Sequence, residues 1–561
     1  MARQSSDETD PGTVPDKPPA ADAAPAADAA AKTGAEAGAG AAKPAAPKPK
    51  PKSKAAGPKR KRAPRTKAAK AAADRAARLR WRLSAFGLVL AVLGIRLGMN
   101  ATGLVPVHFD EAQYWAYGQE LAWGYFSKPP GVAALLRLTT DLFGSGLFGL
   151  RLMSPICHAG IAVLLYLTAE RIWDARTGFW SALAYTAGPG VTVSALIAST
   201  DPPMMLAWAA ALYAMVRAME GGSRLWWAIS GAALGLGALA KYTALAFAGG
   251  AAGYGLFSAR GRDRTGAAIL GGTALLVMAP NLVWNAANGF VTVAHVAEDA
   301  DPGRGYGNPI GFLEFAGAQL GVIGPVIFLA LLAALWQRSA WRGDWGMRLM
   351  AWQAAVLLVP ILVLAFLTRA QPNWAAPAYL GGTILAVRWL LTRDWQAAIV
   401  WGQAVLGLLA AAAVYGLALL YAVGADELPR GPDPFKKMRI GPPFCARALG
   451  VMNEEGAEVL FSDDRRRLSE CMFLGGLDWD QVAIWDPDRL PANHHELVSA
   501  LQPGDGRLMI LATLHDAEGI AARFAEAELI ERDELSTHAD RAYPMSLWRV
   551  QGFEGYDRVY R

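Results

Sequence analysis

Residues 349–367, LMAWQAAVLLVPILVLAFL, contain no charged side chain and are long enough to cross a lipid bilayer as a helix. Apolar stretches of about this length recur between residues 84 and 422, and about eleven can be drawn. Several are rich in glycine and alanine, which lets helices approach closely in lipid. The expected spans are 84–100, 149–169, 177–197, 203–217, 225–240, 243–258, 266–284, 311–335, 349–367, 374–390 and 396–422.

The composition agrees with an α-helical polytopic membrane protein. Hydrophobic residues make up 53% of the chain and charged residues only 18%, whereas soluble domains carry about 25% charged residues. The 561 residues also leave room for a further domain beside a membrane body. We therefore expect a transmembrane domain over residues 83–428 and a small soluble domain over residues 429–561.

The N-terminal segment 1–82 is rich in alanine, proline and lysine, as in KPAAPKPKPKSK and KRKRAPRTK. It carries 19 basic and 8 acidic residues, whereas the remainder carries 35 and 40. Such a composition cannot bury enough apolar surface to offset the entropy of ordering, so we predict a disordered basic cytoplasmic tail. A nucleic-acid-binding arm is the alternative, but contact with anionic lipid head groups is favoured beside a first membrane helix.

Arginines fall in alternate loops between the expected spans. With the N-terminus inside, every cytoplasmic loop contains them, as the positive-inside rule requires. An odd number of spans then places the C-terminal domain outside. The two long outer loops are 101–148 and 285–310. The cytoplasmic arginines are Arg171, Arg176, Arg217, Arg224, Arg260, Arg262, Arg264, Arg338, Arg342, Arg348, Arg388 and Arg393.

The C-terminal segment alternates short apolar runs, AEVLFS, QVAIW and RLMILAT, with the apparently helical stretches PFCARALGVMNEE and HDAEGIAARFAEAEL. This alternation predicts a small α/β domain. It contains Cys445 and Cys471, which either form a disulfide in an extracytoplasmic compartment or stay unpaired. Cys157 lies in an apolar run and is expected to be buried.

Ionisable residues gather at the expected outer ends of the helices. Such groups are costly at the edge of the hydrocarbon and tend to mark function. Cations there can hold a lipid-borne phosphate and offset the charge that grows on it as it leaves. A carboxylate opposite them can take the proton of an acceptor hydroxyl. The candidates are Asp110, Glu111 and Asp201 for catalysis, and Lys128, Lys241 and Arg369 for phosphate binding.

Each candidate also has a structural alternative. Asp110, Glu111 and Asp201 can cap helices, the two lysines can extend to lipid head groups, and Arg369 can anchor a helix end. No cofactor is indicated. No metal-ligand cluster is evident, although the three carboxylates leave a divalent ion near a phosphate open.

These residues also carry a family resemblance. The ordered segments FDEAQYW, GYFSKPPG, STDPP, LAKYTAL and QPNWAAPAYL, across residues 84–422, resemble the bacterial GT-C glycosyltransferases of families 39 and 83. These families include protein O-mannosyltransferase-like enzymes, aminoarabinose transferases and galacturonosyltransferases. The resemblance implies a polyprenyl-phosphate sugar donor, a periplasmic active site in the inner membrane and an inverting mechanism.

The family's site residues carry over by position. The resemblance matches Asp110 to the acidic residue of the first outer loop, Lys128 to the lysine before paired prolines, and Asp201 to the second acidic motif. Lys241 matches the lysine that contacts the carrier phosphate, and Arg369 lies where an outer phosphate-binding residue is expected.

Two positions depart from the aminoarabinose transferases, which resemble a DExRYAE pattern with a glutamate before Lys-Pro-Pro. Here Gln113 replaces the arginine and Ser127 replaces the glutamate. The chain therefore looks closer to the hexose or uronic-acid branch.

We thus expect a glycosyltransferase that acts on an envelope acceptor, either lipopolysaccharide (lipid A) or a protein, without nucleic acid. A flippase or transporter of lipid-linked sugars is the alternative. It would place ionisable groups near the membrane midplane, and the nearly charge-free spans disfavour it.

Overall fold

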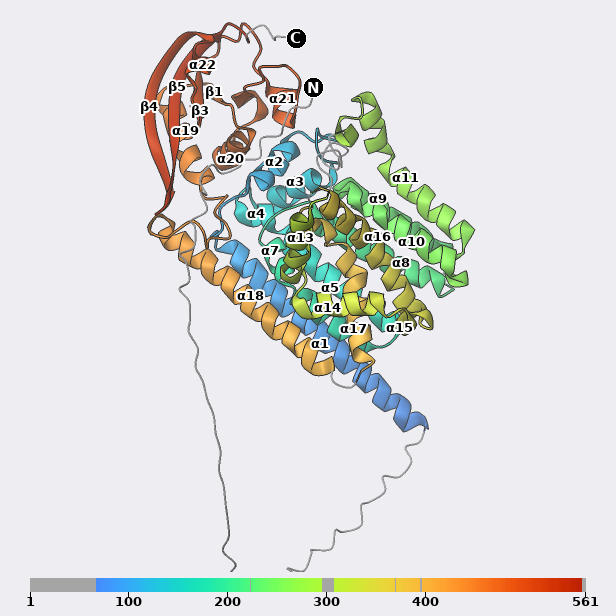
Figure 1. The fold of residues 1–561 in the computed structure, drawn as a ribbon. Helices are drawn as coiled ribbons and strands as arrows, with labels where there is room; N and C mark the ends of the chain where they lie inside the picture. Colours follow the sequence, from blue (N-terminus) through green and yellow to red (C-terminus); the bar gives the residue numbers. More distant parts are fainter. Residues whose placement is uncertain (1–66, 222, 295–306, 369, 394–395, 557–561) are drawn as a thin grey trace, which may run out of the picture. The chain divides into compact units, whose positions relative to one another are not determined.

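The computed structural model describes residues 67–221, 223–294, 307–368, 370–393 and 396–556. Helices form most of this part of the chain, and a five-stranded sheet follows them near the C-terminus (Figure 1). The first half of the helical body contains α1 (Lys67–Ala101), α2 (Phe109–Gln119), α3 (Gly131–Phe143), α4 (Leu147–Arg151), α5 (Met153–Ile172), α6 (Ala175–Thr186), α7 (Pro189–Ser194), α8 (Asp201–Met219) and α9 (Arg224–Ala240).

The second half of the body continues with shorter and longer helices in turn. It contains η1 (Tyr242–Leu245), α10 (Ala246–Phe257), η2 (Ala259–Gly261), α11 (Arg264–Ala287), α13 (Pro309–Val322), α14 (Pro325–Trp336), α15 (Arg338–Arg342), α16 (Trp345–Leu367), η4 (Pro372–Ala375), α17 (Ala378–Leu391), α18 (Gln396–Gly424) and η5 (Ala425–Glu427).

The expected number of membrane spans is not confirmed. Among the described residues, five helices are long and apolar enough to cross a membrane, and α13 with α14 adds a sixth if this pair is one span. The pair is bent by 116°. Gly324 at the bend has a φ of 95°, which glycine adopts without a steric cost, and Pro325 then starts α14. The expected span 177–197 is likewise divided, into α6 and α7, with Pro189 at the start of α7.

The predicted tail extends too far along the chain. Residues 1–66 lie outside the described residues, but 67–82 form the first part of α1 rather than disordered chain. The segment is rich in alanine, which has the highest helix propensity. Arg82 Nε also donates to Glu170 Oε1 at 2.9 Å, and the Glu170 side chain is only 4% exposed. This pairing ties the start of α1 to α5.

The C-terminal domain is built around a sheet with strand order β2-β1-β3-β5-β4. β1 is parallel to β2 and to β3, whereas β5 is antiparallel to β3 and to β4. The three apolar runs form β1, β2 and β3, as predicted. The strands are β1 (Val459–Ser462), β2 (Val482–Ile484), β3 (Met509–Thr513), β4 (Phe524–His538) and β5 (Arg541–Phe553), and the helices are α19 (Gly441–Glu454), α20 (Arg465–Gly475), η6 (Trp479–Gln481), α21 (His494–Ser499) and α22 (Glu518–Ala521).

One expected helix in this domain is wrong. The stretch HDAEGIAARFAEAEL contains the short α22 and then enters β4 at Phe524. β4 pairs with β5 from Phe524 to His538, so cross-strand pairing overrides the helix propensity of its alanines and glutamates. By contrast, PFCARALGVMNEE lies in α19, as expected.

The two cysteines of the domain form a disulfide. Cys445 of α19 is bonded to Cys471 of α20. The bond settles the alternatives left open by the sequence and fixes these two helices to each other. Cys157 is free and buried, as expected.

Candidate active site

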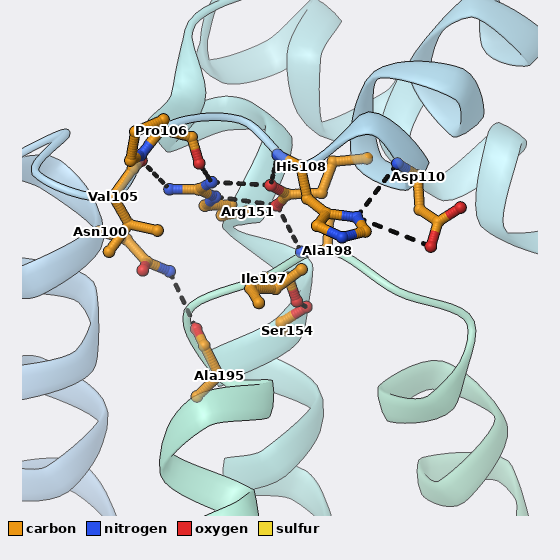
Figure 2. Close-up of polar contacts among 11 residues, drawn as sticks. Asn100, Val105, Pro106, His108, Asp110, Arg151, Ser154, Ala195, Ile197 and Ala198 are labelled. Atoms are coloured by element: carbon orange, nitrogen blue, oxygen red, sulfur yellow. Dashed lines mark hydrogen bonds and ion pairs between the residues drawn. The ribbon is translucent and has the colours of Figure 1, made fainter. Parts of the chain in front are cut away.

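Asp110 lies in the first turn of α2, next to the residue that caps this helix. The His108 ring accepts a hydrogen bond from the Asp110 backbone amide through Nδ1 at 3.2 Å. The same Nδ1 lies 3.6 Å from Asp110 Oδ2. Figure 2 shows Asp110 on the far side of His108 from Arg151. The Asp110 side chain is 45% exposed, so its carboxylate remains accessible to a substrate hydroxyl.

Glu111 does not fit the catalytic role expected for it. Its side chain is fully buried, and Arg151 donates to it twice, from Nε to Oε1 at 2.8 Å and from Nη2 to Oε2 at 2.7 Å. The backbone amides of His108 and Ala198 also donate to it, at 2.9 Å and 2.7 Å. Four donors thus saturate both oxygens. We assign Glu111 a structural role that joins α2, α4 and the segment before α8 (Figure 2).

Asp201 and Lys241 are brought together. Lys241 Nζ donates to Asp201 Oδ1 at 2.7 Å, and Asn373 Nδ2 donates to Asp201 Oδ2 at 2.8 Å. Asp201 starts α8, Lys241 follows the end of α9 and Asn373 lies in η4. Three segments that are far apart in sequence, STDPP, LAKYTAL and QPNW, therefore meet through these side chains. The sequence analysis did not select Asn373, although the signal was present because it lies in a quoted motif.

The loop that carries Lys128 lies beside the end of α9. Gly131 packs so tightly there that an added Cβ would lie 2.7 Å from the Leu239 carbonyl oxygen. The loop is also held by α11, since Asn281 Nδ2 donates to the Trp123 carbonyl at 2.6 Å. Tyr242, the residue after Lys241, donates to Asn281 Oδ1 at 2.7 Å. Lys128 and Lys241 thus belong to neighbouring segments that are connected by hydrogen bonds.

The phenol of Tyr114 in α2 is close enough to both Asp110 and Asp201 to be influenced by their charges. Burial raises the pKa of its phenol well above the usual value, and the negative charges of Asp110 and Asp201 add to this shift. Arg465 opposes it. Asp110 and Asp201 thus both act on one buried hydroxyl, and the positive charge of Arg465 reaches the same place.

Arg465 belongs to the C-terminal domain, which packs on α2 through α20. Its Nη1 donates to Gln113 Oε1 at 2.6 Å, and Trp479 Nε1 donates to the Ala116 carbonyl at 3.0 Å. The Arg466 guanidinium lies 5.2 Å from the centre of the Phe109 ring. The sequence analysis missed these contacts, because no local pattern relates residues that are more than three hundred positions apart.

Two further expectations concern Arg369 and a divalent metal ion. Arg369 lies outside the described residues. The three carboxylates do not share a metal site, since Arg151 occupies Glu111 and Lys241 occupies Asp201. Within the described ranges, no three His, Cys, Asp or Glu side chains are grouped to hold a metal ion.

Comparison with known proteins places the chain in a family. Lipid A galacturonosyltransferase RgtD of Rhizobium johnstonii is 31% identical over 429 residues, which are 74% of this chain and 89% of that protein. The chain belongs to the family of this GT-C glycosyltransferase. Residues 127–284 also match the family described as dolichyl-phosphate-mannose-protein mannosyltransferase. The predicted enzyme class is therefore confirmed.

More distant relatives of this GT-C enzyme agree with the assignment. An undecaprenyl phosphate-aminoarabinose arabinosyl transferase of Pseudomonas aeruginosa is 33% identical over 132 residues, 23% of this chain and 24% of that protein. The solved structure of ArnT from Cupriavidus metallidurans bound to undecaprenyl phosphate has a TM-score of 0.57 at 17% identity. The match covers 83% of this chain and 98% of that one, which shows a shared fold. The predicted GT-C membrane fold is thus confirmed.

Proposed function

We propose that this enzyme transfers a sugar from an undecaprenyl-phosphate carrier to lipid A at the periplasmic face of the inner membrane. The observation that carries the proposal is that Lys241, Asp201 and Asn373 meet beside the loop of Lys128. In addition, the charges of Asp110 and Asp201 act on one hydroxyl, that of Tyr114. Two ammonium groups and an accessible carboxylate suit a phosphate leaving group and an acceptor hydroxyl. The names of the relatives supply the carrier and the acceptor.

The proposed reaction is a single displacement with inversion. Asp110 takes the proton of the acceptor hydroxyl, whose oxygen forms a bond to the anomeric carbon of the sugar. The bond between this carbon and the phosphate oxygen breaks, and its electron pair stays on the lipid phosphate. Lys128 and Lys241 stabilise the negative charge that grows there. Asp201 and Asn373 hold Lys241 in position for this task.

The periplasmic location rests on charge distribution. Arg217 and Arg224 lie at the junction of α8 and α9, whereas Asp201 and Lys241 lie at the opposite ends of these two helices. Since the arginine-bearing ends face the cytoplasm by the positive-inside rule, the candidate site faces outward. Fusion of a periplasm-dependent reporter after residue 556 tests this orientation, and a cytoplasmic signal would contradict it.

Substitution of the two central residues tests the proposed chemistry. We expect Asp110→Asn to lower the transfer rate by about 10²–10⁴-fold, because the base is lost. We expect Lys128→Ala to lower it by about 10²–10³-fold, because the leaving phosphate is less stabilised. The measurement is mass spectrometry of lipid A made by membranes supplied with the carrier-linked sugar.

A matched variant separates chemistry from folding. Asp141→Asn alters an exposed carboxylate on α3 that pairs only with Arg137 in the described structure, and it should retain transfer. All three variants should accumulate in the membrane at similar levels. Near-normal turnover in both Asp110→Asn and Lys128→Ala would contradict the assigned site.

A further inference from the structure

The C-terminal domain places a guanidinium beside the stretch of α2 that carries Asp110. Arg465 is partly buried, and its Nη1 donates to Gln113 Oε1 at 2.6 Å. Gln113 is only 5% exposed and follows Asp110 by three residues, so both lie on one face of the helix. Arg465 therefore borders the candidate active site although it belongs to another domain.

Polar side chains continue from Arg465 towards the Lys128 loop. Gln113, which accepts from Arg465, donates from Nε2 to the Tyr117 hydroxyl. The Ser127 side chain lies close enough to this hydroxyl to lower its pKa against the effect of burial. Ser127 directly precedes Lys128, so the polar side chains next to Arg465 approach the loop of the proposed phosphate site.

The charge of Arg465 is not balanced by an acid. Within the part of the chain that the structure describes, neither Arg465 nor Arg466 forms an ion pair within 4.0 Å, whereas Arg467 Nη1 lies 2.6 Å from Glu470 Oε2. Arg466 instead covers the Phe109 ring. A partly buried guanidinium without an anion is suited to receive one from a ligand.

We propose that Arg465 forms a carboxylate subsite, which binds the acid group of a uronic acid on the polyprenyl-phosphate donor. This inference rests on the proposed function. The transferred sugar must lie between the phosphate at Lys128 and Lys241 and the base Asp110, and the charge of Arg465 acts on the same Tyr114 hydroxyl as the charges of Asp110 and Asp201. The planar fork of a guanidinium matches a carboxylate in shape and in charge.

Ser127 supports the same choice of sugar. Residue 127 is a neutral serine, whereas a carboxylate side chain there would repel a sugar that carries an acid group. Ser127 therefore adds no repulsion, and Arg465 adds a cation nearby. The two features together favour an acidic sugar over a basic or a neutral one.

The test compares two donors that differ only at C6. Purified full-length enzyme is supplied with lipid A and with undecaprenyl-phosphate galacturonic acid or undecaprenyl-phosphate galactose. The wild type should prefer the acidic donor by about 10²-fold in kcat/KM, since a site built around a charged pair rejects a ligand that lacks the charge. Arg465→Gln should remove most of this preference by lowering galacturonosyl transfer, while galactosyl transfer changes by less than about threefold. Arg465→Lys should retain part of the preference for the acidic donor.

Controls identify the ligand group. Arg532→Gln alters an exposed arginine of β4 and should leave the preference intact. An equal loss with both donors in Arg465→Gln would make Arg465 a structural residue and overturn the inference. A rise in the KM for lipid A, with the donor preference unchanged, would assign Arg465 to an anion of the acceptor and overturn it too.

A second variant acts without removing Arg465. Ser127→Glu should selectively lower galacturonosyl transfer, because the new carboxylate repels that of the sugar. Transfer from galactose but not from galacturonic acid by the wild type would overturn the inference and leave the proposed function standing. Transfer from neither donor would also overturn the inference.

Discussion

Glu111 and Arg151 form an ion pair almost completely removed from solvent, with side chains 0% and 2% exposed. Arg151 also donates to the carbonyls of Val105 and Pro106, so it fixes the segment that leads into α2. Asp110 follows this segment directly. The position of the proposed base therefore depends on a neighbour that takes no part in the chemistry.

Removing one partner of this pair should destabilise the protein. Arg151→Ala leaves a buried carboxylate uncompensated, and we expect a loss of about 3–5 kcal/mol in the free energy of unfolding. Thermal denaturation of the detergent-solubilised protein measures the effect. Arg137→Ala, which removes an exposed pair with Asp141, should cost only about 0–1 kcal/mol.

A double variant separates the charge from the packing. Combining Glu111→Gln with Arg151→Met should cost less than Arg151→Ala alone, since no unpaired charge remains buried. Equal melting temperatures for Arg151→Ala and Arg137→Ala would show that the buried pair contributes no more to stability than the exposed pair does.

The sequence proposed candidate residues for the site but not their contacts. Charge at the ends of apolar helices selected Asp110, Asp201, Lys128 and Lys241, because such positions are costly without a function. It could not separate Glu111 from Asp110, since the two are adjacent. Their difference arises from Arg151, which lies forty residues further along the chain.

At the scale of elements, α20 and α21 attach the C-terminal domain to α2. Phe473 of α20 packs against Trp115 with ring centres 5.4 Å apart, and His494 of α21 contacts the Tyr117 ring at 4.6 Å. The next residue, His495, is 1% exposed, and its Nε2 lies 2.7 Å from Ser469 Oγ of α20. His494 thus lies in the contact between α2 and the C-terminal domain, and His495 is buried next to it within that domain.

The buried His495 should make the C-terminal domain sensitive to acid. Burial lowers the pKa of His495 from 6.5 to about 3. The unfolded chain therefore binds a proton below pH 6.5 that the folded chain does not, so stability decreases as the pH falls through the window from 6.5 towards 3. At pH 5 this proton binding lowers the free energy of unfolding by about 2 kcal/mol.

A histidine variant isolates this contribution from that of the carboxylates. We expect His495→Gln to lose less stability than the wild type between pH 7 and pH 5, as measured by thermal denaturation. His515→Gln is the comparison, because the His515 side chain is 64% exposed and pairs with Asp463, so its removal should not reduce the loss of stability in acid. The same loss in all three proteins would refute the role of His495.

Element types were predictable where one local signal dominated. The apolar runs of β1 to β3 are short and buried on both faces, so composition alone indicated strands. β4 has exposed glutamates and alanines over much of its length, and its conformation depends on β5, which follows it. The break between α6 and α7 has a local signal in Gly188 and Pro189, but the apolar pattern continues across it and therefore indicated a single span.

At the scale of the whole molecule, the start of α1 indicates where the N-terminal segment can be removed. The structure shows α1 beginning at Lys67, with Arg78 and Arg82 both bound to Glu170. We expect deletion of residues 1–66 to retain sugar transfer, measured in membranes with equal amounts of enzyme. Deletion of residues 1–82 should lower the melting temperature as well, because Glu170 loses both of its arginine partners. Loss of transfer in the shorter deletion would implicate the tail in function.

The shared core of α2 and the C-terminal domain also has a consequence for biogenesis. Apolar side chains of α2 and α3 belong to the same buried cluster as those of α19, α20 and the sheet. Gln113 and its partner Arg465 are 352 residues apart. At bacterial elongation rates the ribosome needs about 20–70 s to cover that distance. The aromatic face of α2 therefore stays uncovered until the last part of the polypeptide has been made, and premature termination would leave these apolar side chains exposed.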